Sequence, residues 1–202
     1  VIVTSGKVPT WLVIERVLVA ALIVAWSLRL GSYLLVRILR TGTDRRFDGI
    51  RESPLRFGLF WLGQGLTIWI VLLPSTMALS RTGRWFEAWA AVAGGLVWAA
   101  GLVIETVADL QKYRFRNREE NRGRWIQTGL WRWARHPNYF GEMLCWWGLF
   151  LLVTPAIEGW MWLGAAGPVA STILSIKARL LRISTTELIS SSREFGITTT
   201  GS

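Results

Sequence analysis

Four long stretches of this chain carry no charged residue, and they constrain its fold more than any other feature. They have 24, 17, 15 and 18 residues and occupy positions 57–80, 88–104, 143–157 and 159–176. A helix that crosses a bilayer needs about 20 mostly apolar residues, and buried helices of soluble proteins rarely run that long without a charge. Residues 11–39 are also apolar, although Glu15, Arg16 and Arg29 interrupt them. We expect Arg16 and Arg29 either to reach toward an interface or to face the bundle interior. The sequence therefore predicts an all-α, polytopic transmembrane bundle of about five spans.

The composition agrees with a membrane protein and excludes several other classes. Of the 202 residues, 51% are hydrophobic and 18% are charged, and the mean hydropathy is +0.35. These values exclude a disordered chain and an ordinary soluble domain. The single Cys and single His exclude a disulfide scaffold and a multi-Cys or His-rich metal centre, so no metal site is predicted. The 14 Trp are expected where one ring edge is apolar and the other is wet.

Basic residues are concentrated in two connections between the predicted spans. Residues 37–56 hold six Arg and three acids, and residues 112–135 hold eight basic residues and two acids, within an overall net charge of +10. Because cytoplasmic loops carry an excess of Lys and Arg, both loops and the C-terminus are predicted to be cytoplasmic. The localisation expected is integral to the membrane, the inner or plasma membrane if the protein is bacterial. The predicted partners are membrane lipids and a lipidic small molecule, and not nucleic acid.

The two ends of the chain differ from its middle. Residues 1–183 are predicted to form one integral-membrane domain. In residues 184–202, ten of 19 residues are Ser or Thr, which indicates a frayed tail. The chain begins with Val1 and shows no signal peptide, so we expect a processed or trimmed chain that lacks one or more upstream helices.

A polar stripe is predicted at the end of the third apolar stretch. Glu105, Asp109, Lys112 and Arg116 are spaced by four, three and four residues, which places them on one helix face. Carboxylates near lipid are costly and usually functional. They can accept hydrogen bonds from ribose hydroxyls or a carboxamide, whereas the bases can hold phosphates. The alternative is a structural network in which both acids pair with Lys112 and neighbouring Arg residues.

The basic segment 112–135 also has two interpretations. Its Arg residues could bind anionic lipid headgroups by proximity alone. Its Trp and Gly residues instead favour a loop folded against the membrane face. These residues are Gly123, Trp125, Gly129, Trp131 and Trp133.

The chain turns before the fourth apolar stretch, in the string RHPNYFGE at positions 135–142. Pro137 disfavours helix at the residue before it, which is the only His. Asn138 and Tyr139 then lie near the N-terminus of the next helix, where free N–H groups and the helix dipole favour anions. Glu142 lies one turn further on, at the head of the apolar run. An imidazole, a phenol, an amide and a carboxylate gathered so closely indicate a site rather than only a helix cap.

Residues 129–148, GLWRWARHPNYFGEMLCWWG, resemble the steroid 5-alpha-reductase C-terminal family, specifically its bacterial branch of uncharacterised membrane proteins. Sterol delta-14 reductases and isoprenylcysteine carboxyl methyltransferases are similar to a lesser degree. Weaker landmarks extend the resemblance over roughly residues 11–170. They are WSLRLGSYLLVR at 26–37, DRRF at 44–47, Gln64-Gly65, Pro74 and ETVADLQKYRFR at 105–116.

The resemblance implies a helix bundle that holds NADPH on its cytoplasmic side. It implies reduction of an activated carbon–carbon double bond, by hydride transfer, in a lipidic substrate that enters from the bilayer. Matched position by position, it places cofactor contacts at Glu105, Asp109, Arg116, Arg124, His136, Asn138, Tyr139 and Glu142. Tyr33 lies near the family's substrate-facing Tyr, so Tyr33 and His136 are the candidate catalytic residues and proton donors. The steroid reductases carry an amide in place of Glu105 and lack the His-Pro pair, so a steroid substrate is not implied.

Three functions therefore stay open at the level of the sequence. The first is an NADPH-dependent oxidoreductase that acts on a CH–CH group of a steroid-like or other enone. The second is an S-adenosylmethionine-dependent membrane methyltransferase, because the RHPxYxG core is shared with that branch. The third is a non-catalytic membrane protein that retains the fold. Asn138 with Glu142, and the acids Glu105 and Asp109, favour the reductase.

Overall fold

The computed structural model describes residues 10–41, 52–83 and 85–176. The predicted tail at 184–202 and the DRRF landmark at 44–47 lie outside these residues. The α-helices are α1 (Thr10–Thr41), α2 (Pro54–Ser80), α3 (Ala88–Arg116) and α4 (Pro137–Val153). The 3₁₀ helices are η2 (Glu119–Asn121), η3 (Gly129–Arg132), η4 (Thr154–Ala156) and η5 (Gly159–Ala165), and a further α-helical segment covers 166–176. The described part of the chain contains no β-strand, and the predicted all-α fold is confirmed.

Within the described residues, three helices are long and apolar enough to cross a membrane. They cover Val13–Arg40, Pro54–Ser80 and Ala88–Arg116, with mean hydropathies of 1.8, 1.6 and 1.8 in their most apolar windows. The other two predicted spans fall on shorter helices. α4 has 17 residues, and the stretch 159–176 is not one continuous α-helix, because it begins as the 3₁₀ helix η5. Glycine is less favourable in an α-helix than most other residues, and three glycines fall within the first nine residues of that stretch.

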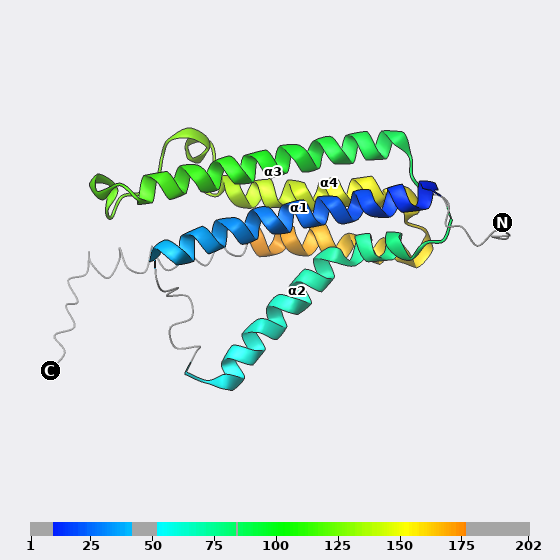
Figure 1. The fold of residues 1–202 in the computed structure, drawn as a ribbon, viewed down its shortest axis with the longest axis horizontal. Helices are drawn as coiled ribbons and strands as arrows, with labels where there is room; N and C mark the ends of the chain where they lie inside the picture. Colours follow the sequence, from blue (N-terminus) through cyan, green and yellow to red (C-terminus); the bar gives the residue numbers. More distant parts are fainter. Residues whose placement is uncertain (1–9, 42–51, 84, 177–202) are drawn as a thin grey trace.

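The helices α1, α3 and α4 lie lengthwise beside one another, and α4 runs opposite to α3 (Figure 1). α2 diverges from this group in its N-terminal half and contains Pro74. Proline cannot donate the hydrogen bond to the carbonyl four residues earlier, here that of Ile70. The backbone at Gly167 covers this carbonyl so closely that a Cβ there would lie 2.8 Å from the Ile70 oxygen. The segment 166–176 therefore packs against α2 at the turn that contains Pro74.

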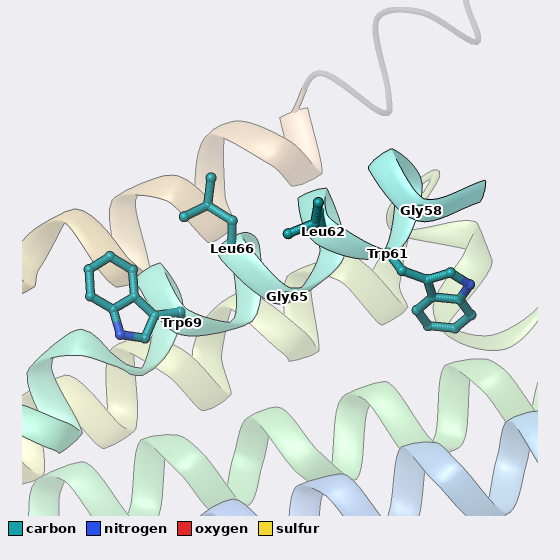
Figure 2. A pocket seen from close by; sticks show the side chains of 6 residues that line it. All are labelled: Gly58, Trp61, Leu62, Gly65, Leu66 and Trp69. Atoms are coloured by element: carbon teal, nitrogen blue, oxygen red, sulfur yellow. The ribbon is translucent and has the colours of Figure 1, made fainter. Parts of the chain in front are cut away.

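The outward side of the diverging half of α2 is apolar. A shallow groove lies there (Figure 2), lined by Gly58, Trp61, Leu62, Gly65, Leu66 and Trp69. Similar side chains are exposed on the other long helices, for example Leu28 on α1 at 68% and Leu96 on α3 at 68%. Apolar surface of this extent on long helices is consistent with contact with membrane lipids.

The closest helix contact joins α3 and α4 through glycines spaced seven residues apart. A Cβ added to Gly94 or Gly101 of α3 would lie 2.6 Å from the carbonyl oxygen of Gly148 or Gly141, respectively. Small residues let helix backbones approach this closely inside a membrane. A Cβ on Gly141 would lie 2.5 Å from the backbone nitrogen of Glu105. This contact therefore sets the first turn of α4 beside the acidic end of α3.

Charged residues that interrupt α1 do not share one environment. Glu15 is only 2% exposed and accepts a hydrogen bond of 3.2 Å from the backbone N–H of Phe86. Arg16 donates to the carbonyl oxygen of Arg81, just after α2, over 3.3 Å. Arg29 faces α3 in the bundle interior. Of the two alternatives expected for the arginines, Arg29 thus takes the interior one.

Candidate functional site

Arg29, in the second half of α1, joins α1 to the acidic end of α3. Its Nη1 lies 2.6 Å from Oε1 of Glu105, and its Nη2 lies 2.6 Å from Oδ2 of Asp109. Its Nε donates to Oγ1 of Thr106 over 3.2 Å, and Nε1 of Trp26 donates to the second oxygen of Glu105 over 3.1 Å. Glu105 is 4% exposed and Asp109 6%. One guanidinium and two carboxylates therefore form a buried network between the two helices.

This network clarifies the predicted stripe on α3. Glu105 and Asp109 do share a helix face, as their spacing predicts, and both form ion pairs with Arg29 of α1, while Lys112 of their own helix lies within electrostatic range of Asp109. Nζ of Lys112 lies 5.1 Å from the ring centroid of Trp131. Arg29 is not among the site residues that the sequence predicts. The sequence does contain a signal that could have identified it. Arg29 lies within an apolar span, and an arginine there is costly in a membrane unless its charge is paired.

α4 adds two further polar side chains to the network. The Asn138 side chain hydrogen-bonds to Asp109, and its Oδ1 is buried without a hydrogen-bond partner in the part of the chain that the structure describes. Glu142, one turn later, hydrogen-bonds with Trp146 and lies within electrostatic range of Arg29. Two carboxylates thus pair with one guanidinium and a third lies within electrostatic range of it, beside an amide oxygen that is free to accept a hydrogen bond.

Arg29 itself retains hydrogen-bonding capacity. An arginine side chain has five N–H donors, and three of them make the contacts with Glu105, Thr106 and Asp109. Both oxygens of Glu105, in contrast, already accept hydrogen bonds from the protein. The groups that a ligand can still engage are therefore the remaining N–H groups of Arg29, Oδ1 of Asn138 and the carboxylate of Glu142.

Tyr33 and Arg116 lie toward the outer side of the same network. The ring centroid of Tyr33 is 5.9 Å from Cζ of Arg29, one turn earlier on α1. Its hydroxyl group lies within electrostatic range of Asp109 and Arg116. Arg116 is exposed at the end of α3. A candidate proton donor and a candidate phosphate ligand thus lie near the buried acids.

His136 and Tyr139 lie together at the first turn of α4. Their rings stack with centroids 5.3 Å apart, and the ring of Trp131 meets His136 edge-on at 6.4 Å. Nε1 of Trp131 donates to the backbone oxygen of Ala108 over 3.0 Å, which fixes η3 against α3. The turn that carries His136 is therefore held beside the acidic end of α3.

The basic loop is folded only in part. Trp131 is buried, and the backbone N–H of Leu130 donates to Oε1 of Gln111 over 3.0 Å, so η3 packs on α3 as expected. Trp125 and Trp133, however, are 69% and 88% exposed. Arg124 is exposed and makes no side-chain hydrogen bond or ion pair within the described ranges. Within the described ranges, no contact therefore joins Arg124 to the network.

The chain is similar to a protein family and to two individual proteins. Residues 7–194 match the family described as "Protein of unknown function (DUF1295)". The chain is 30% identical to Delta(14)-sterol reductase of Neurospora crassa over 158 residues, which cover 66% of this chain and 32% of the reductase. It is 29% identical to Uncharacterized protein C594.04c of Schizosaccharomyces pombe over 177 residues, which cover 70% of this chain and 51% of that protein. The chain thus spans about a third and about half of the lengths of these relatives. No solved structure matches it.

Proposed function

We propose that this chain, which belongs to the DUF1295 family, is a membrane-embedded, NADPH-dependent reductase of a carbon–carbon double bond in a lipid-soluble, steroid-like or other enone substrate. We further propose that it is a relative of the bacterial branch of the steroid 5-alpha-reductase C-terminal family. The similarity to a sterol reductase supports the reaction class. The observation that carries the proposal is the buried network of Arg29, Glu105, Asp109 and Glu142, at the end of apolar helices and beside a free acceptor on Asn138.

The chemistry of these residues fits NADPH. The cofactor combines a carboxamide and ribose hydroxyl groups with phosphates, and the chain places acids and an amide inside the bundle and exposes Arg116 and Arg124. Oδ1 of Asn138 and the carboxylate of Glu142 would accept hydrogen bonds from the carboxamide or ribose, and Arg116 and Arg124 would hold phosphates. Because Arg29 already engages Glu105 and Asp109, these two acids would act by holding its guanidinium in place.

The remaining predicted residues, Tyr33 and His136, are suited to donate the proton that the reaction requires. Reduction of the double bond adds a hydride to one carbon and a proton to the other, and NADPH when bound supplies the hydride. Tyr33 is a phenol beside Arg29, and His136 is an imidazole held by stacking on Tyr139, so either can donate the proton. The apolar helices exclude water from the reacting carbons and give a lipidic substrate access from the bilayer.

A methyltransferase that uses S-adenosylmethionine is the second candidate. One observation favours it: two carboxylates pair with a single guanidinium and a third lies within electrostatic range, and this excess of negative charge suits a ligand with a sulfonium cation. Oδ1 of Asn138 favours NADPH over this candidate. It is buried without a hydrogen-bond partner in the described residues, and the carboxamide of NADPH can donate a hydrogen bond to it.

Ligand-induced stabilisation of the detergent-purified protein tests both candidates. A ligand at 100 times its Kd stabilises the folded state by about 2.7 kcal/mol, which raises Tm measurably. We expect NADPH to raise Tm and S-adenosylmethionine to leave it unchanged. Loss of the NADPH effect in Asn138→Ala would assign it to the network, with Asn117→Ala, at the end of α3, as the control. A rise with S-adenosylmethionine alone would contradict the reductase, and no response to either ligand would favour the non-catalytic alternative.

A further inference from the structure

Trp133 has the most exposed large hydrophobic side chain in the described part of the protein, at 88%. It directly follows η3 and precedes the turn into α4. Arg132 and Arg135 flank it, and both are exposed. Neither arginine side chain makes a hydrogen bond or an ion pair within the residues that the structure describes. A large indole between two unpaired cations indicates a surface that binds a partner with an apolar part and a negative charge.

The position of Trp133 along the bundle matches the boundary between apolar and polar surroundings. The charge-free part of α3 ends at residue 104. η3 is held on the next turns of α3, through the hydrogen bond from Trp131 to Ala108 and the contact of Lys112 with the Trp131 ring. Trp133 therefore lies at the level where α3 changes from apolar to charged. Tryptophan side chains concentrate at this depth in membrane proteins.

The charges around this position are of one sign. The only acids between Lys112 and Arg135 are Glu119 and Glu120. Each lies near an arginine of its own turn: Arg122 is 3.9 Å from Glu119, and Arg118 is 3.6 Å from Glu120. The charges of Arg132 and Arg135 are therefore not compensated by these acids.

We propose that Arg132, Trp133 and Arg135 form a docking surface for the headgroup region of anionic phospholipid. The indole ring of Trp133 inserts between lipids at the interface, and the two guanidinium groups bind headgroup phosphates with charge-assisted hydrogen bonds. This surface is separate from the network of Arg29, and it does not depend on the proposed reductase activity.

Lipid binding to the purified full chain in detergent tests this surface. Native mass spectrometry counts phosphatidylglycerol and phosphatidylcholine bound at increasing lipid concentration. We expect the parent chain to bind phosphatidylglycerol more tightly than phosphatidylcholine. In Arg132→Gln/Arg135→Gln the affinity for phosphatidylglycerol should fall about fivefold for each arginine removed. Trp133→Ser should weaken the binding of both lipids, because the ring contacts the apolar part that they share.

Matched controls separate this surface from general charge and general exposure. Arg118→Gln/Arg122→Gln removes two exposed arginines of the same loop, and Trp160→Ser removes an indole that is 71% exposed on η5. Both controls should retain the preference for phosphatidylglycerol. The proposal is overturned if the two lipids bind equally, or if the control pair of arginines causes the same loss. It is also overturned if inorganic phosphate or NADPH displaces the lipid at millimolar concentration, because the arginines would then bind a free phosphate group. Unchanged Tm values without lipid would show that the variants fold.

Discussion

Arg29 of α1 and Glu105 of α3 are 76 positions apart in the chain, and their side chains lie 2.6 Å apart inside the bundle. The pair couples two apolar helices through a charge that neither could carry alone in a membrane. It also explains how the acids at the end of α3 are stabilised inside the bundle.

Removing Arg29 should therefore destabilise the protein itself. Arg29→Gln removes the ion-pair partner of the buried carboxylates Glu105 and Asp109, which costs about 3–5 kcal/mol. Arg40→Gln, which removes an exposed arginine from the same helix, serves as the control. Unfolding of the ligand-free protein in detergent measures both. In Arg29→Gln/Glu105→Gln/Asp109→Asn the charges are removed together, and most of the stability should return. A stable Arg29→Gln protein would contradict the network.

The contact between α3 and α4 can be tested with two neighbouring glycines. In Gly94→Ala the added Cβ would lie 2.6 Å from the backbone oxygen of Gly148, whereas at Gly95 nothing lies within 4 Å. Gly94→Ala should destabilise the protein by about 1–3 kcal/mol, because backbone atoms cannot move aside easily. Gly95→Ala should be neutral or stabilising by up to about 1 kcal/mol, because alanine favours the helix. Equal effects of the two substitutions on unfolding would mean that the helices are not packed as described.

Substitution of Glu142 distinguishes a role in ligand binding from a structural role as a brace between elements. A brace would require Glu142 to pair with a nearby arginine such as Arg132 or Arg135, but both arginines are exposed and no ion pair joins either one to Glu142 in the described part of the chain. Glu142→Gln should then leave the ligand-free protein as stable as before, or slightly more so, and abolish NADPH binding or turnover. Glu158→Gln, an exposed glutamate paired with Arg81 at 2.8 Å, is the control. A drop in stability of about 3–5 kcal/mol with NADPH binding intact would identify a brace.

Arg116 tests the phosphate side of the proposed cofactor site. Arg116→Ala should weaken NADPH binding by about 1.5–3 kcal/mol, the range for hydrogen bonds to charged groups. Arg118→Ala, two residues later and near Glu120, should have little effect. Titration of NADPH against the purified variants measures the difference. If NADPH binds both variants equally, Arg116 has no role in holding phosphate.

The orientation predicted from the Lys and Arg distribution can be checked with cysteine labelling. The native Cys145 is buried, so introduced cysteines should dominate the signal. Gly83→Cys and Gly123→Cys place exposed thiols in the connections at opposite ends of α3. An impermeant reagent added outside intact cells should label position 83 and spare position 123. The reverse pattern would refute the predicted sidedness.

Several features of this protein followed from the sequence alone. The charge-free stretches were sufficient to predict an all-α membrane protein, because a long uncharged helix is stable in lipid and rare in a soluble fold. The spacing of Glu105 and Asp109 placed them on one helix face, since helical periodicity is a local property. Pro137 similarly predicted the turn before α4, because its effect on the preceding residue is local.

Only the tertiary structure decided which groups meet. The seven-residue spacing of Gly94 with Gly101 and of Gly141 with Gly148 is visible in the sequence, but the pairing of the two helices depends on packing between segments about 47 residues apart. That pairing brings Asn138 and Glu142 to the acids of α3. Whether Arg29 would face lipid headgroups or the interior depended on the same packing, because a buried arginine is stable only where another helix supplies its counter-charges.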